Sequence, residues 1–115
     1  MVYETMEQCL EEVENRYKSG EKVRKKLKNF FDTLEIKFLD TGRTVSIVIN
    51  GPDGIEVKDK TETPDAPVKI EFIEEKTMMG LFNKEIGAVD SYSSGAIKVI
   101  KGKISNLLKM RSLLF

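Results

Sequence analysis

Apolar residues in the amino-terminal part of the chain recur with the period of a helix. The first predicted helix covers residues 2–18, and its apolar face carries Val2, Met6, Leu10 and Val13. Ser19-Gly20 interrupts this pattern, and a second apolar stripe follows in residues 21–31. We expect Ser19 to cap the second helix, because a serine hydroxyl accepts a hydrogen bond from a free backbone N–H at a helix start.

From residue 34 onward the period changes to two. Apolar and charged residues alternate in five segments, which predicts five strands with one buried and one exposed face. These segments are residues 34–38, 45–50, 55–58, 68–72 and the stretch between Gly95 and Gly102. The first three are joined by short turns, so we expect them to form an antiparallel meander.

Helical patterns return in the second half of the chain, at residues 74–82, 85–92 and 104–115. Strands with a single apolar face are typical of a sheet that helices cover on one side. We therefore predict an α+β fold with a five-stranded, mainly antiparallel sheet and helices on one face. With 115 residues, the chain has the usual length of one domain, so residues 1–115 are expected to form a single domain.

Composition narrows the classes of function. Basic and acidic residues number 19 each, which argues against a nucleic-acid partner, since such binding depends on neutralising phosphates. The chain has no histidine and one cysteine, so we expect no metal site, no cofactor and no internal disulfide. No apolar run is long enough to span a bilayer, and the amino terminus does not resemble a secretory signal. We expect a cytoplasmic protein.

One local charge cluster departs from this balance, with five basic residues in the seven from Lys22 to Lys28. Such a run is typical of a solvated helix face. The alternative is a transient contact with a membrane surface, since each basic residue near anionic lipid contributes about 1 kcal/mol.

Two short motifs were considered as catalytic candidates. Asp40-Thr41-Gly42 resembles the triplet that supplies one carboxylate of a dimeric aspartic protease, but the same residues are typical of a hairpin turn. Ser91, Ser93 and Ser94 could act as nucleophiles only with a lysine base, and they are also typical of a helix end. We interpret both as structural and expect no enzymatic activity.

The apolar residues of the later helices are the most distinctive feature of the sequence. Residues 78–92 and 107–115 carry broad apolar faces, and three of the five methionines lie in them. Methionine adapts to irregular cavities. The pattern is compatible with a solid core and with an apolar pocket between these helices and the sheet.

Several segments of the chain follow one another in a characteristic order: Lys28–Phe31, Leu34–Phe38, Asp40–Gly42, Val45–Ile49, Ala66–Ile70, Ser94–Val99 with Gly102, and Leu107–Met110. This order resembles that of the sterol carrier protein type two domain, from about Glu12 to Leu114. The chain also departs from the family pattern, for example at Lys103, where an acidic or amide residue that could cap the last helix is usual. Asn83 stands where a glycine is usual, and the spacing from Gly95 to Gly102 is one residue longer, which predicts a β-bulge.

The resemblance implies a hydrophobic tunnel between sheet and helices that binds a sterol, a fatty acid, an acyl-CoA or a related lipid without covalent chemistry. Carried over by position, its lining would be Ile47, Ile49, Met78, Met79, Phe82, Ile86, Val99, Leu107, Met110 and Leu114. The alternative is an interaction domain without a ligand, in which the apolar tail Leu113–Phe115 docks on a partner or forms a homodimer.

Overall fold

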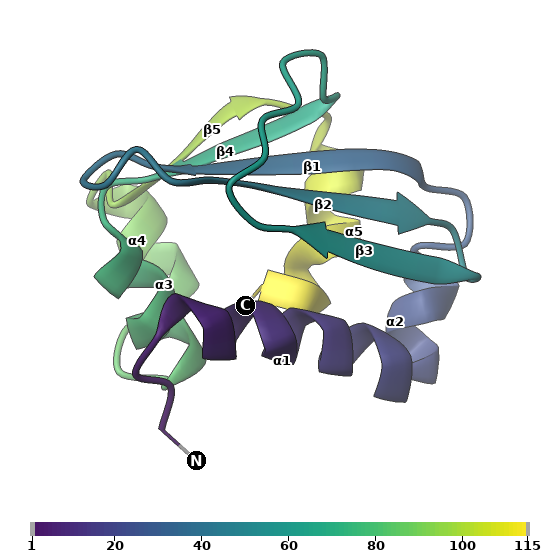
Figure 1. Cartoon of the computed structure of the whole chain (residues 1–115), viewed down its shortest axis with the longest axis horizontal. Coiled ribbons are helices and arrows are strands. Elements are labelled where there is room, and N and C mark those ends of the chain that lie inside the picture. Colours follow the sequence, from purple (N-terminus) through teal and green to yellow (C-terminus); the bar gives the residue numbers. More distant parts are fainter. Residues whose placement is uncertain (1, 115) are drawn as a thin grey trace.

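Five strands form one twisted sheet, and the helices lie beneath one of its faces (Figure 1). The computed structural model describes residues 2–114, without the side chain of Ile104. The helices are α1 (Met6–Ser19), α2 (Glu21–Lys26), α3 (Glu75–Phe82), α4 (Ala88–Ser93) and α5 (Ile104–Leu114). The strands are β1 (Phe31–Phe38), β2 (Thr44–Asn50), β3 (Gly54–Lys58), β4 (Val68–Phe72) and β5 (Ile97–Lys101). The predicted α+β class is confirmed.

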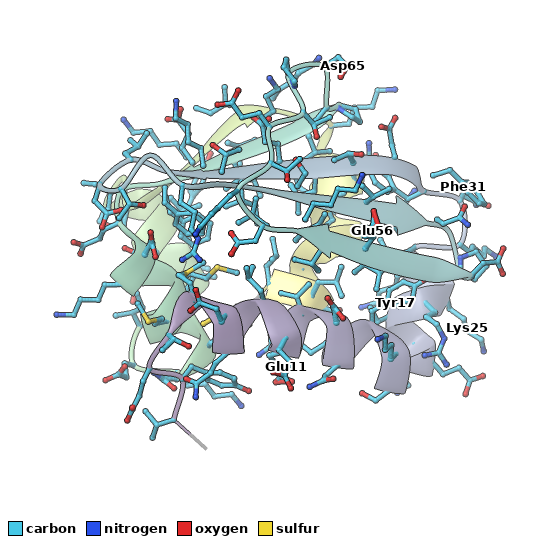
Figure 2. All side chains as sticks on the ribbon, in the orientation of Figure 1. Glu11, Tyr17, Lys25, Phe31, Glu56 and Asp65 are labelled. Atoms are coloured by element: carbon cyan, nitrogen blue, oxygen red, sulfur yellow. The ribbon has the colours of Figure 1, made fainter. Side chains whose placement is uncertain are left out.

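The strand order is β3-β2-β1-β4-β5, and the sheet is mostly antiparallel. β1, β2 and β3 form the predicted meander. β1 and β4 run parallel, because the chain must cross from β3 at one edge back to the centre of the sheet. The crossing segment, residues 59–67, rises over the face opposite the helices, with Asp65 at its tip (Figure 2). It is tied to that face by Ser46, whose hydroxyl donates to the Thr61 carbonyl at 2.8 Å.

The apolar positions of the strands face the helices, as the alternation predicts. Leu34 pairs with Ile47 and Ile36 with Val45 across β1 and β2, and all four side chains are fully buried. α1 covers this face with its own apolar side, while Glu11 points away from the sheet (Figure 2). Burial of branched apolar side chains of this kind stabilises a fold by about 1.5–3 kcal/mol each.

The two amino-terminal helices differ from the predicted bounds. α1 begins at Met6 rather than residue 2, because Thr5 is its N-cap and forms a capping box with Gln8. Ser19 does not cap α2. It is the last residue of α1, and its hydroxyl donates to the Asn15 carbonyl one turn back.

The second helix was predicted to reach residue 31, but it ends at Lys26. The Gly51 N–H donates to the Phe30 carbonyl at 2.8 Å, and Phe31 pairs with Asn50 as the first residue of β1. Pairing with β2 therefore overrides the helical spacing of these two phenylalanines.

The later elements follow the prediction with one shortening and one confirmed irregularity. The helix predicted for residues 85–92 is shorter at its start, since α4 begins at Ala88. In β5 the register shifts by one residue between the pairs Lys69–Lys101 and Ile70–Val99. Ile100 is the extra residue, so the bulge predicted from the long glycine spacing is present.

Candidate functional site

An apolar pocket lies between the β4–β5 edge of the sheet and helices α4 and α5. Its volume is about 100 Å³. We call it the β5 pocket, and its lining consists of Ile70, Ala88, Tyr92, Ile97, Val99, Leu107, Met110 and Leu114. All eight side chains are apolar or aromatic, so the pocket offers dispersion contacts and burial rather than charge.

Each wall of the β5 pocket follows from local structure. Ile70 and Val99 are cross-strand partners, and together with Ile97 they form the floor of the pocket. Leu107, Met110 and Leu114 are spaced by three and four positions, which places them on one face of α5. Gly102 precedes this helix with φ +145°, and a Cβ there would lie 3.3 Å from Val68. Glycine therefore allows the close turn that brings α5 back beneath the sheet.

The carboxyl end of α5 is held firmly on the amino-terminal helices. Leu113 and Leu114 are buried, and the Arg16 guanidinium donates to the Leu113 carbonyl at 3.1 Å. Two of the three residues that the interaction-domain alternative assigned to a partner, Leu113 and Leu114, are therefore covered within this chain. Phe115 lies outside the described residues. The helix is thus anchored at its end, and Leu107, Met110 and Leu114 along its length border the pocket.

The residues proposed from the resemblance are divided between the pocket and the core. Val99, Leu107, Met110 and Leu114 line the β5 pocket. Ile47, Ile49, Met78 and Phe82 are buried in the core, and Met79 packs against it. Ile86 is 43% exposed at the surface. Among these described residues, the four from the helical region at 78–86 do not border the pocket, so α4 rather than α3 supplies this wall.

Contacts with the amino-terminal segment explain the position of α3. Asn83 accepts from the Tyr3 N–H at 2.6 Å and donates to the Tyr3 carbonyl at 2.9 Å. The Tyr3 ring meets the Phe82 ring edge-on, with 5.6 Å between the ring centroids. The Arg16 guanidinium stacks on the Phe82 ring, with its Cζ 4.3 Å from the ring centroid. The side chain of Asn83, where a glycine was expected, therefore fastens α3 to the start of the chain.

Four lining residues were not among those proposed from the sequence: Ile70, Ala88, Tyr92 and Ile97. Ile70 and Ile97 belong to the inward-facing set of β4 and β5, so strand alternation carried a signal for them. Ala88 and Tyr92 are four positions apart on α4 and share one face. Ala88 is too small for an apolar pattern to single it out.

A second hollow, of about 440 Å³, is polar and centred on Arg43. The Arg43 guanidinium donates to Asp59 through two nitrogens at 3.0 and 2.8 Å, to Glu75 at 3.0 Å and to Glu7 at 2.8 Å. The hydrogen bonds to Asp59 are the largest influence that raises the pKa of Arg43. Because its donors are occupied by carboxylates from α1, α3 and the crossing segment, we interpret Arg43 as a structural link rather than an anion site.

Three of the four catalytic candidates, Asp40, Ser91 and Ser94, have structural partners. The Asp40 carboxylate accepts from the Glu75 N–H at 3.2 Å, so it satisfies a free donor in the first turn of α3. Ser91 and Ser94 donate to the carbonyls of Gly87 and Ser91. Cys9 is fully buried, and burial raises the pKa of its thiol to about 11, which makes it a poor nucleophile at neutral pH.

Within residues 2–114 we found no cluster of three or more acidic, cysteine or histidine side chains arranged to hold a metal ion. Among the described helices, none has the length and apolar character needed to cross a bilayer.

No protein-family model and no curated protein sequence matches the chain. Several solved structures do match the chain in their fold. Sterol carrier protein 2 superposes with a TM-score of 0.64 at 15% identity, over 92% of this chain and 87% of that chain. The ubiquinone synthesis protein UbiJ-SCP2 superposes with a TM-score of 0.65 at 16% identity, over 95% and 84% of the two chains.

The same fold occurs within a larger enzyme. The stereoselective inverting sec-alkylsulfatase Pisa1 from Pseudomonas sp. matches with a TM-score of 0.63 at 16% identity. The match covers 79% of this chain but 14% of the sulfatase, so the chain corresponds to a small part of that protein. Similarity at these identities concerns the architecture. The chain has the fold of sterol carrier protein 2, as the order of its sequence motifs predicted.

Proposed function

We propose that this protein binds a hydrophobic lipid in the β5 pocket without covalent chemistry, and that it can carry this ligand between sites. The observation that supports the proposal is the apolar pocket between the sheet and α5, whose lining includes four of the ten residues that the resemblance implies. Sterol carrier protein 2 and UbiJ-SCP2 have the same fold. Sterols, fatty acids, acyl-CoA and ubiquinone are therefore the ligands to test first.

The size of the pocket sets a condition on this proposal. An apolar cavity of about 150 Å³ holds a molecule the size of benzene, and pockets for larger ligands span roughly 300–1,000 Å³. The β5 pocket, at about 100 Å³, therefore accommodates the end of an alkyl chain and must widen for more. α4 can move outward at modest cost, because it has six residues and Ser91 is its only buried one in the described structure.

Energetics allow useful affinity once the pocket widens. Each buried methylene contributes about 0.8 kcal/mol, so an alkyl chain of about a dozen methylenes could bind with roughly micromolar affinity after ordering costs. Apart from the Tyr92 hydroxyl, the lining of the pocket is apolar, so burial and dispersion contacts would supply the affinity.

The basic helix α2 supports a transient contact with a membrane surface. Lys22, Lys25, Lys26 and Lys28 are exposed, and Lys25 lies at the outer side of the molecule (Figure 2). α2 packs on α5, so a membrane bound at α2 would lie next to a helix of the pocket wall. Co-sedimentation with phosphatidylserine vesicles should fall when Lys22 and Lys25 are changed to glutamine, and it should not change for zwitterionic vesicles.

The absence of catalysis, the cytoplasmic location and the single-domain organisation remain predictions from the sequence. Asp40→Asn tests the protease hypothesis directly, because no activity should depend on this carboxylate. The homodimer hypothesis needs another surface than the tail, and light scattering of the purified chain tests it.

The first experiment is mass analysis of the protein purified under mild conditions. We expect lipid in organic extracts, adducts in native mass spectra and displacement of a fluorescent fatty acid. Ala88→Leu adds bulk beside the pocket and should abolish displacement, whereas Val89→Leu adds bulk on the neighbouring position, which is 75% exposed, and should retain it. A bare chain mass without any displacement, or equal binding by the two variants, would contradict the proposal.

A further inference from the structure

Exposed apolar side chains gather on the three elements that border the β5 pocket. Val89 and Tyr92 lie one turn apart on α4. Ile100 is the extra residue in β5, and Leu108 follows the pocket residue Leu107 on α5. Val89, Tyr92, Ile100 and Leu108 each have more than half of their surface exposed, and we call these four residues the rim surface. Apolar patches bordered by polar residues mark interaction sites.

The rim surface lies where the β5 pocket opens to solvent. An open cleft of about 480 Å³ lies where the end of α4 leads into β5. Tyr92, Ile97 and Val99 line both this cleft and the β5 pocket, and Ile100 lines the cleft. The boundary of the pocket is therefore incomplete on this side, since the exposed ring of Tyr92 stands between the buried space and water. A partner seated on the rim surface would close it.

Charges on the two sides of this opening have opposite signs. Residues 85–94, which include α4, contain the acids Glu85 and Asp90 and no base. Residues 95–114, which include β5 and α5, contain no acid and five bases: Lys98, Lys101, Lys103, Lys109 and Arg111. Glu71 lies opposite Lys98 on β4, and Asp65 borders the same hollow as Lys101. Within residues 2–114, however, none of these seven charged residues forms a salt bridge at 4.0 Å or less.

This distribution of charge fits a second copy of the chain. In a two-fold dimer the same surface is used by both copies, so α4 of each copy can lie on the β5–α5 side of the other. The acids of each α4 then face the bases of the other copy. A bilayer fits less well, because Glu85 and Asp90 would be held against anionic headgroups. Side-by-side pairing of the two β5 edges is also disfavoured, because it would bring Lys98 and Lys101 of both copies together.

We propose that the chain forms a weak homodimer through the rim surface, with α4 of each copy on the β5–α5 side of the other. The second copy covers the exposed apolar residues and closes the open side of the β5 pocket. α2 lies at the other end of the helical layer from α4 (Figure 1), so its basic side chains stay free. The dimer needs no ligand and therefore does not depend on the proposed function.

Sedimentation equilibrium of the full chain tests this interface. At low salt, the mass of the wild-type protein should rise with concentration toward twice that of one chain, and added salt should weaken the association. Val89→Lys places a cation against the bases of the other copy and should weaken dimerisation at least about 10-fold. Leu39→Lys changes an exposed apolar residue in the turn after β1, outside the rim surface, and should dimerise as wild type. Circular dichroism checks that each variant is folded.

Charge reversal distinguishes this arrangement from other contacts between copies. One chain carries Glu85→Lys and Asp90→Lys, and a second carries Lys98→Glu and Lys101→Glu. Each should be monomeric alone, because like charges then meet, whereas their equimolar mixture should dimerise. A mixture that stays monomeric, or equal dimerisation of wild type and Val89→Lys, would overturn the proposal. A wild-type chain that is monomeric at every concentration would also overturn it, and vesicle binding that requires Val89 would then assign the rim surface to a bilayer. Lipid displacement is measured separately, so its failure would leave the dimer in place.

Discussion

On the sheet face that the helices cover, the region beneath β1, β2 and β3 is packed differently from the region beneath β4 and β5. Beneath β1, β2 and β3, the side chains of Val13, Leu34 and Ile47 are fully buried, and α1 contacts β3. Beneath β4 and β5, α4 and α5 leave the β5 pocket, and Val89 is 75% and Leu108 60% exposed. The first region is a closed core, and the second is a covered space with apolar residues around it.

This difference indicates how one small sheet can support both folding and binding. More than half of the buried core residues lie in residues 6–49, so this part can hold the fold while the open region changes shape. Binding sites are drawn from the less stable parts of a protein, because they must open to admit a ligand. Anchoring of α5 by Arg16 at its carboxyl end connects the two regions without filling the pocket.

The largest expected effect comes from truncating one residue in each region. Ile47→Ala should lower the free energy of unfolding by about 3 kcal/mol, because it opens a cavity in closed packing. Leu107→Ala should cost about 1 kcal/mol, since Leu107 is half-buried and already borders empty space. Urea denaturation followed by circular dichroism measures both. Equal losses would mean that the open region is as tightly packed as the closed one.

Substitution of Arg43 tests the ion pairs that join this residue to α1, α3 and the crossing segment. Arg43→Gln should lower stability by about 2 kcal/mol at neutral pH, because three carboxylates then face one another without their cation. Arg43→Lys should cost less, since it keeps the charge but not the paired geometry.

The cost of Arg43→Gln should also depend on pH. The hydrogen bond from Arg43 holds the pKa of Glu7 below its ordinary value, so this contribution is complete above about pH 4.3 and is lost as pH falls through the lowered pKa. The stability gap between wild type and Arg43→Gln should therefore narrow in acid. A gap that is constant down to pH 3 would contradict the assignment.

The ionisation of the Cys9 thiol at alkaline pH tests how well α1 is buried against the closed region. Its pKa is raised by burial from an ordinary value of 9.0 to about 11. The unfolded chain therefore releases the thiol proton first, and stability should decline between these pH values by an amount on the order of 2 kcal/mol. Cys9→Ala should show a shallower decline over the same range. Thermal melts at successive pH values measure the difference, which should also appear as slow alkylation of the folded wild type.

The smallest effect is expected at the clamp between α3 and the amino-terminal segment. Asn83→Ala removes the two hydrogen bonds to Tyr3 and should cost about 1 kcal/mol. It should also speed proteolysis before α1 and leave lipid binding unchanged, because α3 does not border the β5 pocket in the described structure. Loss of binding in this variant would assign α3 to the open region instead.

Part of the fold could be predicted from the periodicity of apolar residues along the chain. Each strand was located by its alternation. A bulge between Gly95 and Gly102 was expected because this spacing is one residue longer than in the resembled family, and the register of β4 and β5 places it at Ile100. The bounds of the first two helices could not be located in this way. Phe30 and Phe31 continue a helical stripe, but pairing of β1 with β2 claims them, and this pairing depends on residues far along the chain.

Of the residues proposed from the sequence, those on α5 border the β5 pocket and those on α3 do not. Leu107, Met110 and Leu114 were selected from the last helix and line the pocket. Met78 and Phe82 were selected for the same reason and lie in the core. An apolar helix face has the same pattern whether it meets other side chains or an empty space, so the sequence does not separate the two cases.

The sequence by itself determined the α+β class, the five strands with their inward faces, and the unusual apolar character of the later helices, because these follow from local spacing and chain length. Tertiary structure alone decided that β1 and β4 run parallel, that the tail of α5 is buried, and that the space lies at β5 rather than beneath α3. These features depend on how distant segments pack against one another, and local patterns of apolar residues are the same for contacts that close and contacts that leave a gap.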